Sequence, residues 1–316
     1  MNFTTKIPIA KSNSPIDYSS KIVSIGSCFA DNIGEKFDFF KFQTTSNPFG
    51  IIFNPVSIEK IIDRAVNLIY FTADDLFFHN ELWHCYEVHS DLSNENKEEF
   101  LSNLNQILKE TNQQLTTATH LIITYGTSWV YKLKSTGTVV ANCHKVPQNQ
   151  FDKEILSVEE VEKSILKSVD LIRKANLNCN LIFTISPVRH LKDGFIENQL
   201  SKAHLITAVQ KISNHKLSNI HYFPSYEIVM DELRDYRFYA QDMLHPNSIA
   251  IDYIWERFCE STIVEEAIPI MQEVESIQKG MAHRPFHPQS ISHIKFLQSL
   301  NEKAALLKAQ FPFMKF

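Results

Sequence analysis

The order of secondary structure in this chain is decided by residues 21–37, KIVSIGSCFADNIGEKF. The first five residues form a short β-type run that stops at Gly26. Phe29, Ile33 and Phe37 follow at intervals of four, a spacing that places them on one face of a helix. The segment therefore predicts a buried strand, a glycine-containing turn and a helix.

Three further apolar runs of strand length end in the same way, at a glycine or a proline-containing turn. They are residues 120–125 (HLIITY), 180–185 (NLIFTI) and 219–223 (NIHYF). Apolar residues recur at helical spacing in the segments 57–69, 97–115, 158–175, 197–212 and 249–259. Ser57 and Ser157 are the expected N-caps of the first and third of these helices. Strands that alternate with long helices predict a mostly parallel sheet covered on both faces.

Two aromatic-rich segments interrupt this alternation. Residues 77–88 predict a hairpin that turns at His79-Asn80. Residues 131–141 predict a second hairpin, which turns at 135–137. Each follows an element of the main alternation, so we expect both to overhang the carboxyl edge of the sheet.

The C-terminal part, residues 265–316, is helical by pattern with a break at 283–288. We find no internal repeat and no low-complexity linker. We therefore expect a single domain over residues 1–316, with a core of about 20–260 and a helical extension of about 265–316.

Composition narrows the class of protein. The chain has 316 residues, 44% of them hydrophobic and 21% charged, with a net charge of -5, which is typical of a folded globular protein. Basic residues are scattered singly, so we expect neither nucleic acid nor an anionic membrane surface as a partner. The first 20 residues lack the apolar core of a signal peptide, and no stretch approaches the ~18 apolar residues of a membrane span. We expect a soluble, cytoplasmic protein.

The five cysteines are Cys28, Cys85, Cys143, Cys179 and Cys259, and no two form a C-x-x-C pair. This spacing offers neither a zinc knuckle nor a thioredoxin-like motif. Free thiols in a reducing compartment are the simplest interpretation. Cys179 and Cys259 lie in apolar surroundings and are expected to fill the core.

Ligands of open parallel sheets bind beyond the carboxyl ends of the strands, which directs attention to Cys28. This residue starts the first helix, where backbone N–H groups and the helix dipole favour a thiolate nucleophile. The alternative is a small residue that fills the turn. Ser27 is a competing nucleophile, but an N-cap role explains it better.

Asp242 and His245 form a D-x-x-H unit after the last predicted strand. A carboxylate three residues before a histidine can hold the imidazole in one tautomer. The other ring nitrogen would then draw the proton from Cys28. The alternative is that both are chance polar residues at a helix start.

The segment 26–30, Gly-Ser-Cys-Phe-Ala, resembles the motif for which the GSCFA family is named, and that family resembles a branch of the SGNH (GDSL-type) hydrolases. The resemblance implies a three-layer, flavodoxin-like α/β/α fold with a mostly parallel five-stranded sheet. It places Cys28 at the nucleophile position and matches Asp242 and His245 to the Asp-x-x-His of the superfamily. Similarity to bacterial GSCFA proteins extends over residues 142–145, 186–190 and 192–194, and covers about 20 to 260 in all.

The same resemblance implies donors for an oxyanion. Gly50 is the candidate for the glycine N–H of the second SGNH block, although its surroundings also fit an ordinary tight turn. Ser128 stands where the third block, Gly-x-Asn, has its asparagine. The usual amide donor is therefore missing.

Three other residues are candidates to line the site. Asn142 and His144 would reach it from the second hairpin, with Asn142 replacing the missing donor. His190 would reach it from the end of a strand, unless it caps the next helix. A metal shared by His144, His190 and His245 is a further alternative, but we expect none, because the triad interpretation already gives Asp242 and His245 roles.

We therefore expect an acyl-ester hydrolase or an O-acyltransferase that uses Cys28, His245 and Asp242 on a small-molecule or carbohydrate ester, without a cofactor. The alternative is an SGNH-like binding module without turnover, since the nucleophile is exchanged and the asparagine is missing. Oxidoreductase chemistry at Cys28 lacks a resolving cysteine nearby in the sequence. The substrate, the acyl acceptor and the oligomeric state stay open.

Overall fold

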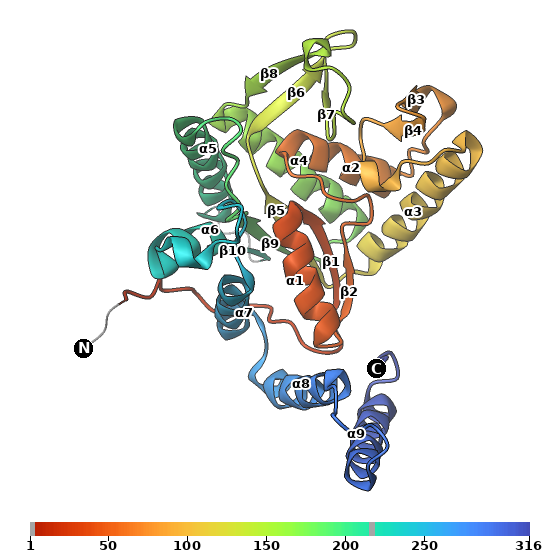
Figure 1. Cartoon of the computed structure of the whole chain (residues 1–316). Helices are drawn as coiled ribbons and strands as arrows, with labels where there is room; N and C mark the ends of the chain where they lie inside the picture. Colours follow the sequence, from red (N-terminus) through yellow and green to blue (C-terminus); the bar gives the residue numbers. More distant parts are fainter. Residues whose placement is uncertain (1–3, 215–218) are drawn as a thin grey trace.

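A five-stranded parallel sheet forms the centre of the protein in the computed structural model, which describes residues 4–214 and 219–316 (Figure 1). Its strands are β1 (Lys21–Gly26), β2 (Gln43–Ser46), β5 (His120–Tyr125), β9 (Asn180–Ile185) and β10 (Ile220–Phe223). They lie in the order β10-β9-β5-β1-β2, with every neighbouring pair parallel. Counted along the chain, this order is 2-1-3-4-5, the flavodoxin-like arrangement. The predicted fold class is confirmed, and β2 is the strand that periodicity did not reveal.

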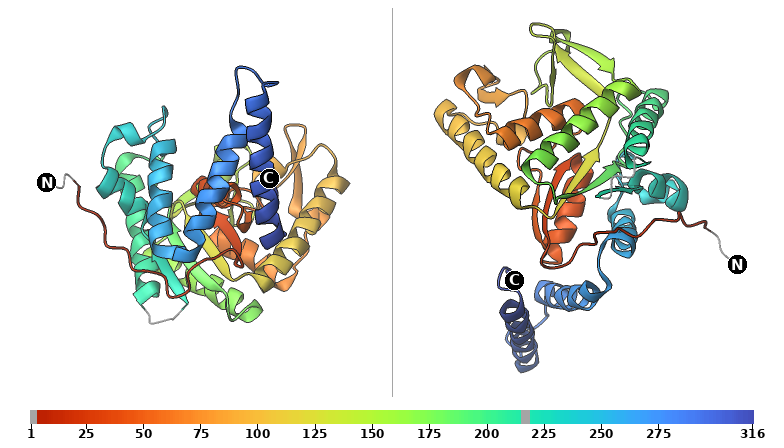
Figure 2. Two further views of the ribbon diagram at one scale, coloured as in Figure 1. Left: turned by 90° about the horizontal axis from the view of Figure 1, so that it is seen from below. Right: turned by 180° about the vertical axis from the view of Figure 1, so that it is seen from behind.

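Helices cover both faces of the sheet. One face carries α2 (Pro55–Asn67), α3 (Lys97–Thr117), α4 (Val158–Ala175) and α5 (Phe195–Asn214), as the view from behind shows (Figure 2). The other carries α1 (Cys28–Phe39) and α7 (Ser248–Thr262), and α8 (Ile268–Ala282) and α9 (Ile291–Gln310) extend that layer. Along β1, Ile22 joins the hydrophobic cluster of the second face and Val23 that of the first, because successive strand residues point to opposite sides.

The helix starts follow ordinary capping chemistry. α4 has the predicted bounds, and Ser157 and Glu160 form the predicted capping box. For α2 the predicted N-cap was wrong. Asn54 caps this helix, since its Oδ1 accepts the N–H of Ser57 at 2.9 Å, and Pro55 occupies the first helical position.

Both predicted hairpins are present. β3 (Leu76–His79) pairs with β4 (Leu82–Cys85), and the turn falls on Asn80 and Glu81, one residue later than predicted, where both backbones have positive φ. β6 (Trp129–Leu133), β7 (Thr138–Val140) and β8 (Phe151–Ile155) form a separate antiparallel sheet, of which β8 was not predicted. These two insertions lie at the end of the molecule opposite α8 and α9 (Figure 1).

The remaining elements are short: η1 (Ala73–Asp75), η2 (Ser90–Leu92), η3 (Gln148–Gln150), α6 (Ser225–Glu227), η4 (Ile228–Leu233), η5 (Tyr236–Phe238) and η6 (Glu265–Ala267). The predicted break in the C-terminal helices is confirmed between α8 and α9. Buried residues of both helices, such as Val274 and Leu307, share one hydrophobic cluster with Phe37 of α1. No helix in the described ranges combines the length and apolar character needed to cross a membrane.

Candidate active site

Cys28 is the first residue of α1, directly beyond the carboxyl end of β1. The turn before it is fixed against the neighbouring strand, because the N–H of Ser27 donates to Thr124 O at 3.0 Å. Ser27 is buried, and its Oγ accepts the N–H of Phe29 at 3.3 Å, so it is the N-cap of α1. Cys28 itself is partly exposed and has no disulfide partner.

The helix end alone does not activate this thiol. Burial raises the pKa of Cys28 above its ordinary value, and the carboxylate of Asp31 raises it further. Lys202 and the N–H groups of Cys28 and Phe29 lower the pKa, but the net direction is upward. Burial therefore outweighs the helix N-terminus in its effect on the pKa of this thiol.

A buried lysine that our sequence interpretation missed lies at the same edge of the sheet as Cys28. Lys202, on α5, is only 1% exposed. Its Nζ donates to Gly126 O at 2.6 Å and to Ser186 O at 2.7 Å, the carbonyls that directly follow β5 and β9. Burial lowers the pKa of Lys202 to about 7, and the charge of Cys28 acts in the opposite direction.

The signal for Lys202 was its place in the helical pattern. It stands three and seven residues before Leu205 and Val209, both buried on the inner face of α5. A lysine on the apolar stripe of a helix is a candidate buried amine. No motif marked it, so residue type alone suggested a surface position.

His190 lies close to Gly126, the residue that directly follows β5. A Cβ built on Gly126 would lie 2.8 Å from Phe53 Cβ, 3.3 Å from His190 Nε2 and 3.4 Å from Ser27 Cβ, so only glycine lets these groups close around this point. Nε2 of His190 is buried and has no hydrogen-bond partner in the part of the chain that the structure describes. Burial, followed by the charges of Lys202 and His245, lowers the pKa of His190 to about 3, so its imidazole is neutral.

The D-x-x-H unit has the geometry that its spacing predicts. Asp242 Oδ2 accepts from Nδ1 of His245 at 2.6 Å. Asp242 Oδ1 accepts the N–H groups of Leu244 and His245 at 2.9 and 3.0 Å. These hydrogen bonds lower the pKa of Asp242 to about 2. The carboxylate therefore fixes the proton on Nδ1 and leaves Nε2 as the nitrogen that can exchange a proton.

The loop that carries His245 is attached to the end of β9. The N–H of Arg189 donates to Leu244 O at 3.1 Å, and its Nη1 donates to Met243 O at 3.1 Å. His190 and His245 thus come from adjoining segments. The charge of Lys202 acts on Cys28 and on His190, and that of His245 acts on His190. The structure brings these four side chains to one edge of the sheet.

Two of the expected oxyanion donors are engaged within the fold. The N–H of Gly50 donates to Asn47 O at 2.7 Å and the residue has φ +73°, so the tight turn is the role that the structure shows. Ser128 is buried, its N–H donates to Ser201 Oγ at 2.8 Å, and its Oγ donates to Ser201 O at 3.3 Å. Neither group is left to bind an oxyanion in this conformation.

Asn142 and His144 connect the two insertions. Asn142 Oδ1 accepts the N–H of His144 at 2.8 Å, and His144 Nε2 donates to Cys85 O at 2.8 Å. The ring of His144 packs against His84, with centroids 4.6 Å apart. Burial lowers the pKa of His144 to about 4. Across residues 4–214 and 219–316, no three or more His, Cys, Asp or Glu side chains are grouped so as to hold a metal ion.

A cavity of about 200 Å³ adjoins the loop of His245. It is lined by Arg189, Gln199, Val229, Met230, Arg234, Asp235, Tyr236 and Tyr239. The guanidinium carbon of Arg189 lies 5.7 and 5.3 Å from the ring centroids of Tyr236 and Tyr239. This cavity offers aromatic rings and a cation to a small ligand.

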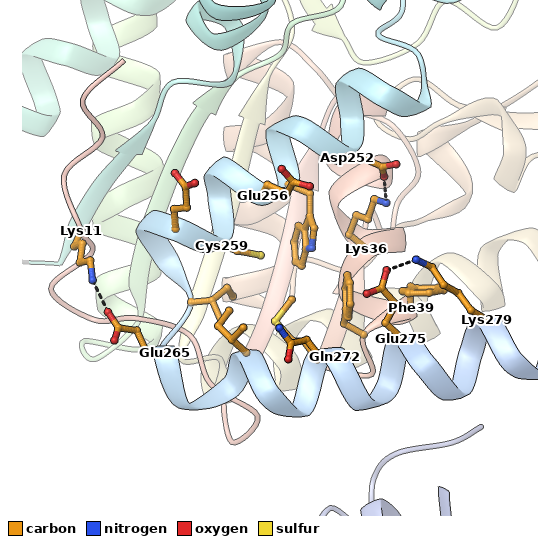
Figure 3. A pocket seen from close by; sticks show the side chains of 16 residues that line it. Lys11, Lys36, Phe39, Asp252, Glu256, Cys259, Glu265, Gln272, Glu275 and Lys279 are labelled. Atoms are coloured by element: carbon orange, nitrogen blue, oxygen red, sulfur yellow. Dashed lines mark hydrogen bonds and ion pairs between the residues drawn. The ribbon is translucent and has the colours of Figure 1, made fainter. Parts of the chain in front are cut away.

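A larger cavity, of about 990 Å³, lies between α7 and α8 (Figure 3). Lys36 and Phe39 line it from the last turn of α1, while Cys28 stands at the first turn of that helix. Neither Cys28 nor His245 lines this cavity. We therefore place the candidate active site at the carboxyl edge of the sheet and not in this larger cavity.

Comparison with known proteins gives a family and solved structures of similar fold. A family model described as the GSCFA family matches residues 21–258, and one described as the C-terminal domain of GSCFA domain proteins matches residues 274–316. No curated protein sequence matches the chain. Among solved structures, the chain is similar to an acetyl xylan esterase from the rumen bacterium Butyrivibrio proteoclasticus, at 11% identity and a TM-score of 0.39. That similarity covers 79% of this chain and 64% of the other, which is less than two thirds of its length.

Proposed function

This chain belongs to the GSCFA family, and on that premise we propose that it is an acyl-ester hydrolase or O-acyltransferase whose nucleophile is Cys28. The main support is the hydrogen bond of 2.6 Å between Asp242 and Nδ1 of His245. An oriented imidazole and a nucleophile at a helix N-terminus are the two parts that acyl transfer requires. The 2-1-3-4-5 sheet order also supports the relationship to SGNH hydrolases.

In the proposed reaction the imidazole of His245 takes the S–H proton of Cys28, and Sγ attacks the carbonyl carbon of the ester. The imidazolium of His245 gives its proton to the leaving alcohol, and a thioester remains on Cys28. Water, or a hydroxyl of an acceptor, then attacks the thioester and passes its proton to neutral His245. The charge of Asp242 stabilises the imidazolium. The start of α1 supplies backbone N–H groups and a dipole for the oxyanion.

We further propose an acylated carbohydrate as the substrate. The cavity beside the loop of His245 has the size of a single small ring, and Tyr236 and Tyr239 offer faces on which a sugar ring can stack. Arg189 supplies N–H donors for sugar oxygens. The acyl group would then extend from this cavity toward Cys28.

A binding module without turnover is the second candidate. It is favoured by the raised pKa of Cys28 and by the engagement of Gly50 and Ser128 within the fold. A protein of this kind would hold a carbohydrate or a small acyl ligand beside an unreactive thiol.

An activated ester distinguishes the two candidates. We expect p-nitrophenyl acetate to give a burst of nitrophenol and an acetylated Cys28 peptide by mass spectrometry. Cys28→Ala should lose both, whereas Cys143→Ala, which removes another partly exposed thiol, should keep both. The absence of a burst and of an adduct on Cys28 at every pH would reject the enzyme and favour the binding module.

A further inference from the structure

The cavity of about 200 Å³ beside the loop of His245 offers hydrogen-bond donors to a ligand. The guanidinium of Arg189 has five N–H groups, and the described part of the chain occupies one of them, from Nη1 to Met243 O at 3.1 Å. Gln199 also lines the cavity, and its Oε1 accepts the hydroxyl of Tyr226 at 2.7 Å. The NH2 group of Gln199 is therefore the part that is left for a ligand.

The guanidinium of Arg189 is held in place by aromatic rings. Its carbon lies 5.5, 5.7 and 5.3 Å from the ring centroids of Phe195, Tyr236 and Tyr239. Three rings and one carbonyl thus fix the plane of the group before any ligand arrives. A planar donor that is already oriented loses little side-chain entropy when it binds an anion.

The backbone around this cavity has features that are typical of ligand sites. η4 is a π-helix, and its residues Val229 and Met230 line the cavity. π-helical turns are rare and occur often at functional sites. Arg234, at the end of η4, has φ +45°, and Met243, whose carbonyl accepts from Arg189, has φ +60°. Left-handed backbone costs energy in residues other than glycine and is concentrated at ligand sites.

The charges that line the cavity favour an anion with a single negative charge. Two arginines line it together with one carboxylate, that of Asp235. Asp235 lies 3.7 Å from Nε of Arg237 and accepts the N–H of that residue at 2.9 Å, so it is engaged outside the cavity. The ion pair of Arg234 with Asp231 is 77% and 66% exposed, and water weakens it. A phosphate would be repelled by Asp235 more strongly than a carboxylate, because its charge approaches two.

We propose that this cavity binds the carboxylate of a sugar acid. A carboxylate matches the guanidinium of Arg189 through two parallel hydrogen bonds, and the sugar ring packs on Tyr236. The N–H of Arg189 donates to Leu244 O at 3.1 Å, so an acyl group on the same sugar lies beside the loop of His245. That the acylated sugar acid is the substrate rests on the proposed function, whereas its binding can be tested without turnover.

The test is a series of ligand-detected NMR titrations of the full chain at neutral pH and low salt. Methyl glucuronoside carries the carboxylate, methyl glucoside lacks it, and glucose 6-phosphate has a phosphate instead. The variants are Arg189→Gln and Arg234→Gln. Arg284→Gln is the matched control, because Arg284 is exposed between α8 and α9 and does not line the cavity.

We expect wild type to bind methyl glucuronoside more tightly than methyl glucoside by a factor on the order of 10 to 10². Glucose 6-phosphate should bind more weakly than the glucuronoside. Arg189→Gln should lose the preference for the carboxylate, since glutamine has no charge and only two N–H donors. Arg234→Gln should weaken binding of the glucuronoside several-fold, and Arg284→Gln should bind all three ligands as wild type does.

Equal affinity of wild type for the two glycosides would overturn the proposal, because the carboxylate is then not recognised. Tighter binding of glucose 6-phosphate would make phosphate the preferred anion. Unchanged affinity for the glucuronoside in Arg189→Gln would place the carboxylate elsewhere. Should Arg189→Gln fail to fold, the exposed Arg234 still decides, since an unchanged preference in Arg234→Gln counts against this cavity.

Acetylated forms of the two glycosides separate this inference from the proposed function. Binding of the glucuronoside that depends on Arg189, without release of acetate or an acetyl adduct on Cys28, would leave the sugar-acid site standing and reject the proposed function. Turnover of both acetylated glycosides at equal kcat/KM would keep the proposed function and reject the sugar acid as its substrate.

Discussion

Asn47 donates from Nδ2 to Asp31 Oδ1 at 2.6 Å and holds that carboxylate within reach of Cys28. The same amide accepts the N–H of Gly26 through its Oδ1 at 2.7 Å. One side chain from the turn after β2 thus connects the end of β1 with the first turns of α1. The carboxylate that it positions works against ionisation of the thiol.

Replacing Asp31 by Asn should make Cys28 more reactive. The charge of Asp31 raises the pKa of the thiol, so its removal should lower that pKa and increase the alkylation rate at neutral pH by several-fold. Glu35→Gln, one turn further along α1, is the control and should leave the rate unchanged. An unchanged rate in Asp31→Asn would show that the carboxylate does not reach the thiol.

Asp242→Asn should impair turnover more than binding. The amide can still accept the N–H of Leu244, but it cannot stabilise an imidazolium. We expect kcat for an activated ester to fall by a factor on the order of 10² to 10⁴ with little change in KM. Asp231→Asn, at an exposed position of η4, provides the comparison. Equal kcat values for the two variants would remove Asp242 from the proposed mechanism.

The stability of the fold should depend on pH through Lys202. Its pKa is about 7 when folded and 10.5 as the ordinary value, so the unfolded chain binds more protons between these limits. The folded state should therefore become more stable as pH rises from about 7 to 10.5. Below about pH 7 this gain in stability is absent. The full effect is on the order of 5 kcal/mol.

Urea unfolding of wild type and Lys202→Met at several pH values measures this contribution. The difference in unfolding free energy should shift in favour of wild type as pH rises from neutral to alkaline. A difference that does not change with pH would contradict a neutral Lys202. Lys211→Met should show no such slope.

Tyr236 should affect substrate binding without affecting chemistry. It lines the cavity beside Arg189 and is 65% exposed. We expect Tyr236→Ala to raise KM for an acylated sugar several-fold and to leave kcat unchanged, because stacking is lost equally in ground and transition states. Tyr70→Ala, at another exposed tyrosine, should change neither constant. A fall in kcat with constant KM would place Tyr236 in the catalytic machinery instead.

His144 should make the two insertions sensitive to acid. Its folded pKa is about 4 and the ordinary value is 6.5, so the unfolded chain binds the extra proton between these values. Stability from this group is complete above about pH 6.5 and is lost as pH falls toward 4. His144→Gln should lose less stability over this range than wild type, in thermal melts at several pH values. His283→Gln, at an exposed position, should behave as wild type does.

The sequence predicted the parts of this fold in which one local pattern dominates. The strands β1, β5 and β9 are mostly apolar runs, and α4 carries a complete capping box, so their positions followed from periodicity. β2 is four half-buried polar residues, QTTS, whose extended form is imposed by pairing with β1. No local pattern encodes such a strand, because its stability comes from a neighbour.

The candidate site also has residues that a local sequence pattern predicts and residues that only distant contacts bring into place. Asp242 and His245 are three residues apart, so their hydrogen bond was predictable from spacing. Lys202 reaches the carbonyls that follow β5 and β9 only because α5 packs beside these strand ends, a contact between residues far apart in the sequence. Ser128 and Gly50, which the sequence left open, show the opposite case. A family position suggested a ligand contact, whereas nearby backbone and hydroxyl groups had already engaged them.

The parallel sheet also determines when the turn at Cys28 can form while the chain is being synthesised. β1 pairs with β5 in the register of Ile22 with His120, about 100 residues later, and the N–H of Ser27 needs Thr124 O. At roughly 5–20 residues per second, the ribosome takes on the order of 5 to 20 seconds to make the intervening stretch. During that interval the turn that holds Cys28 lacks the neighbouring strand β5, and the thiol is open to solvent and to other chains. A chaperone that covers the nascent first strand would protect the nucleophile as well as the fold.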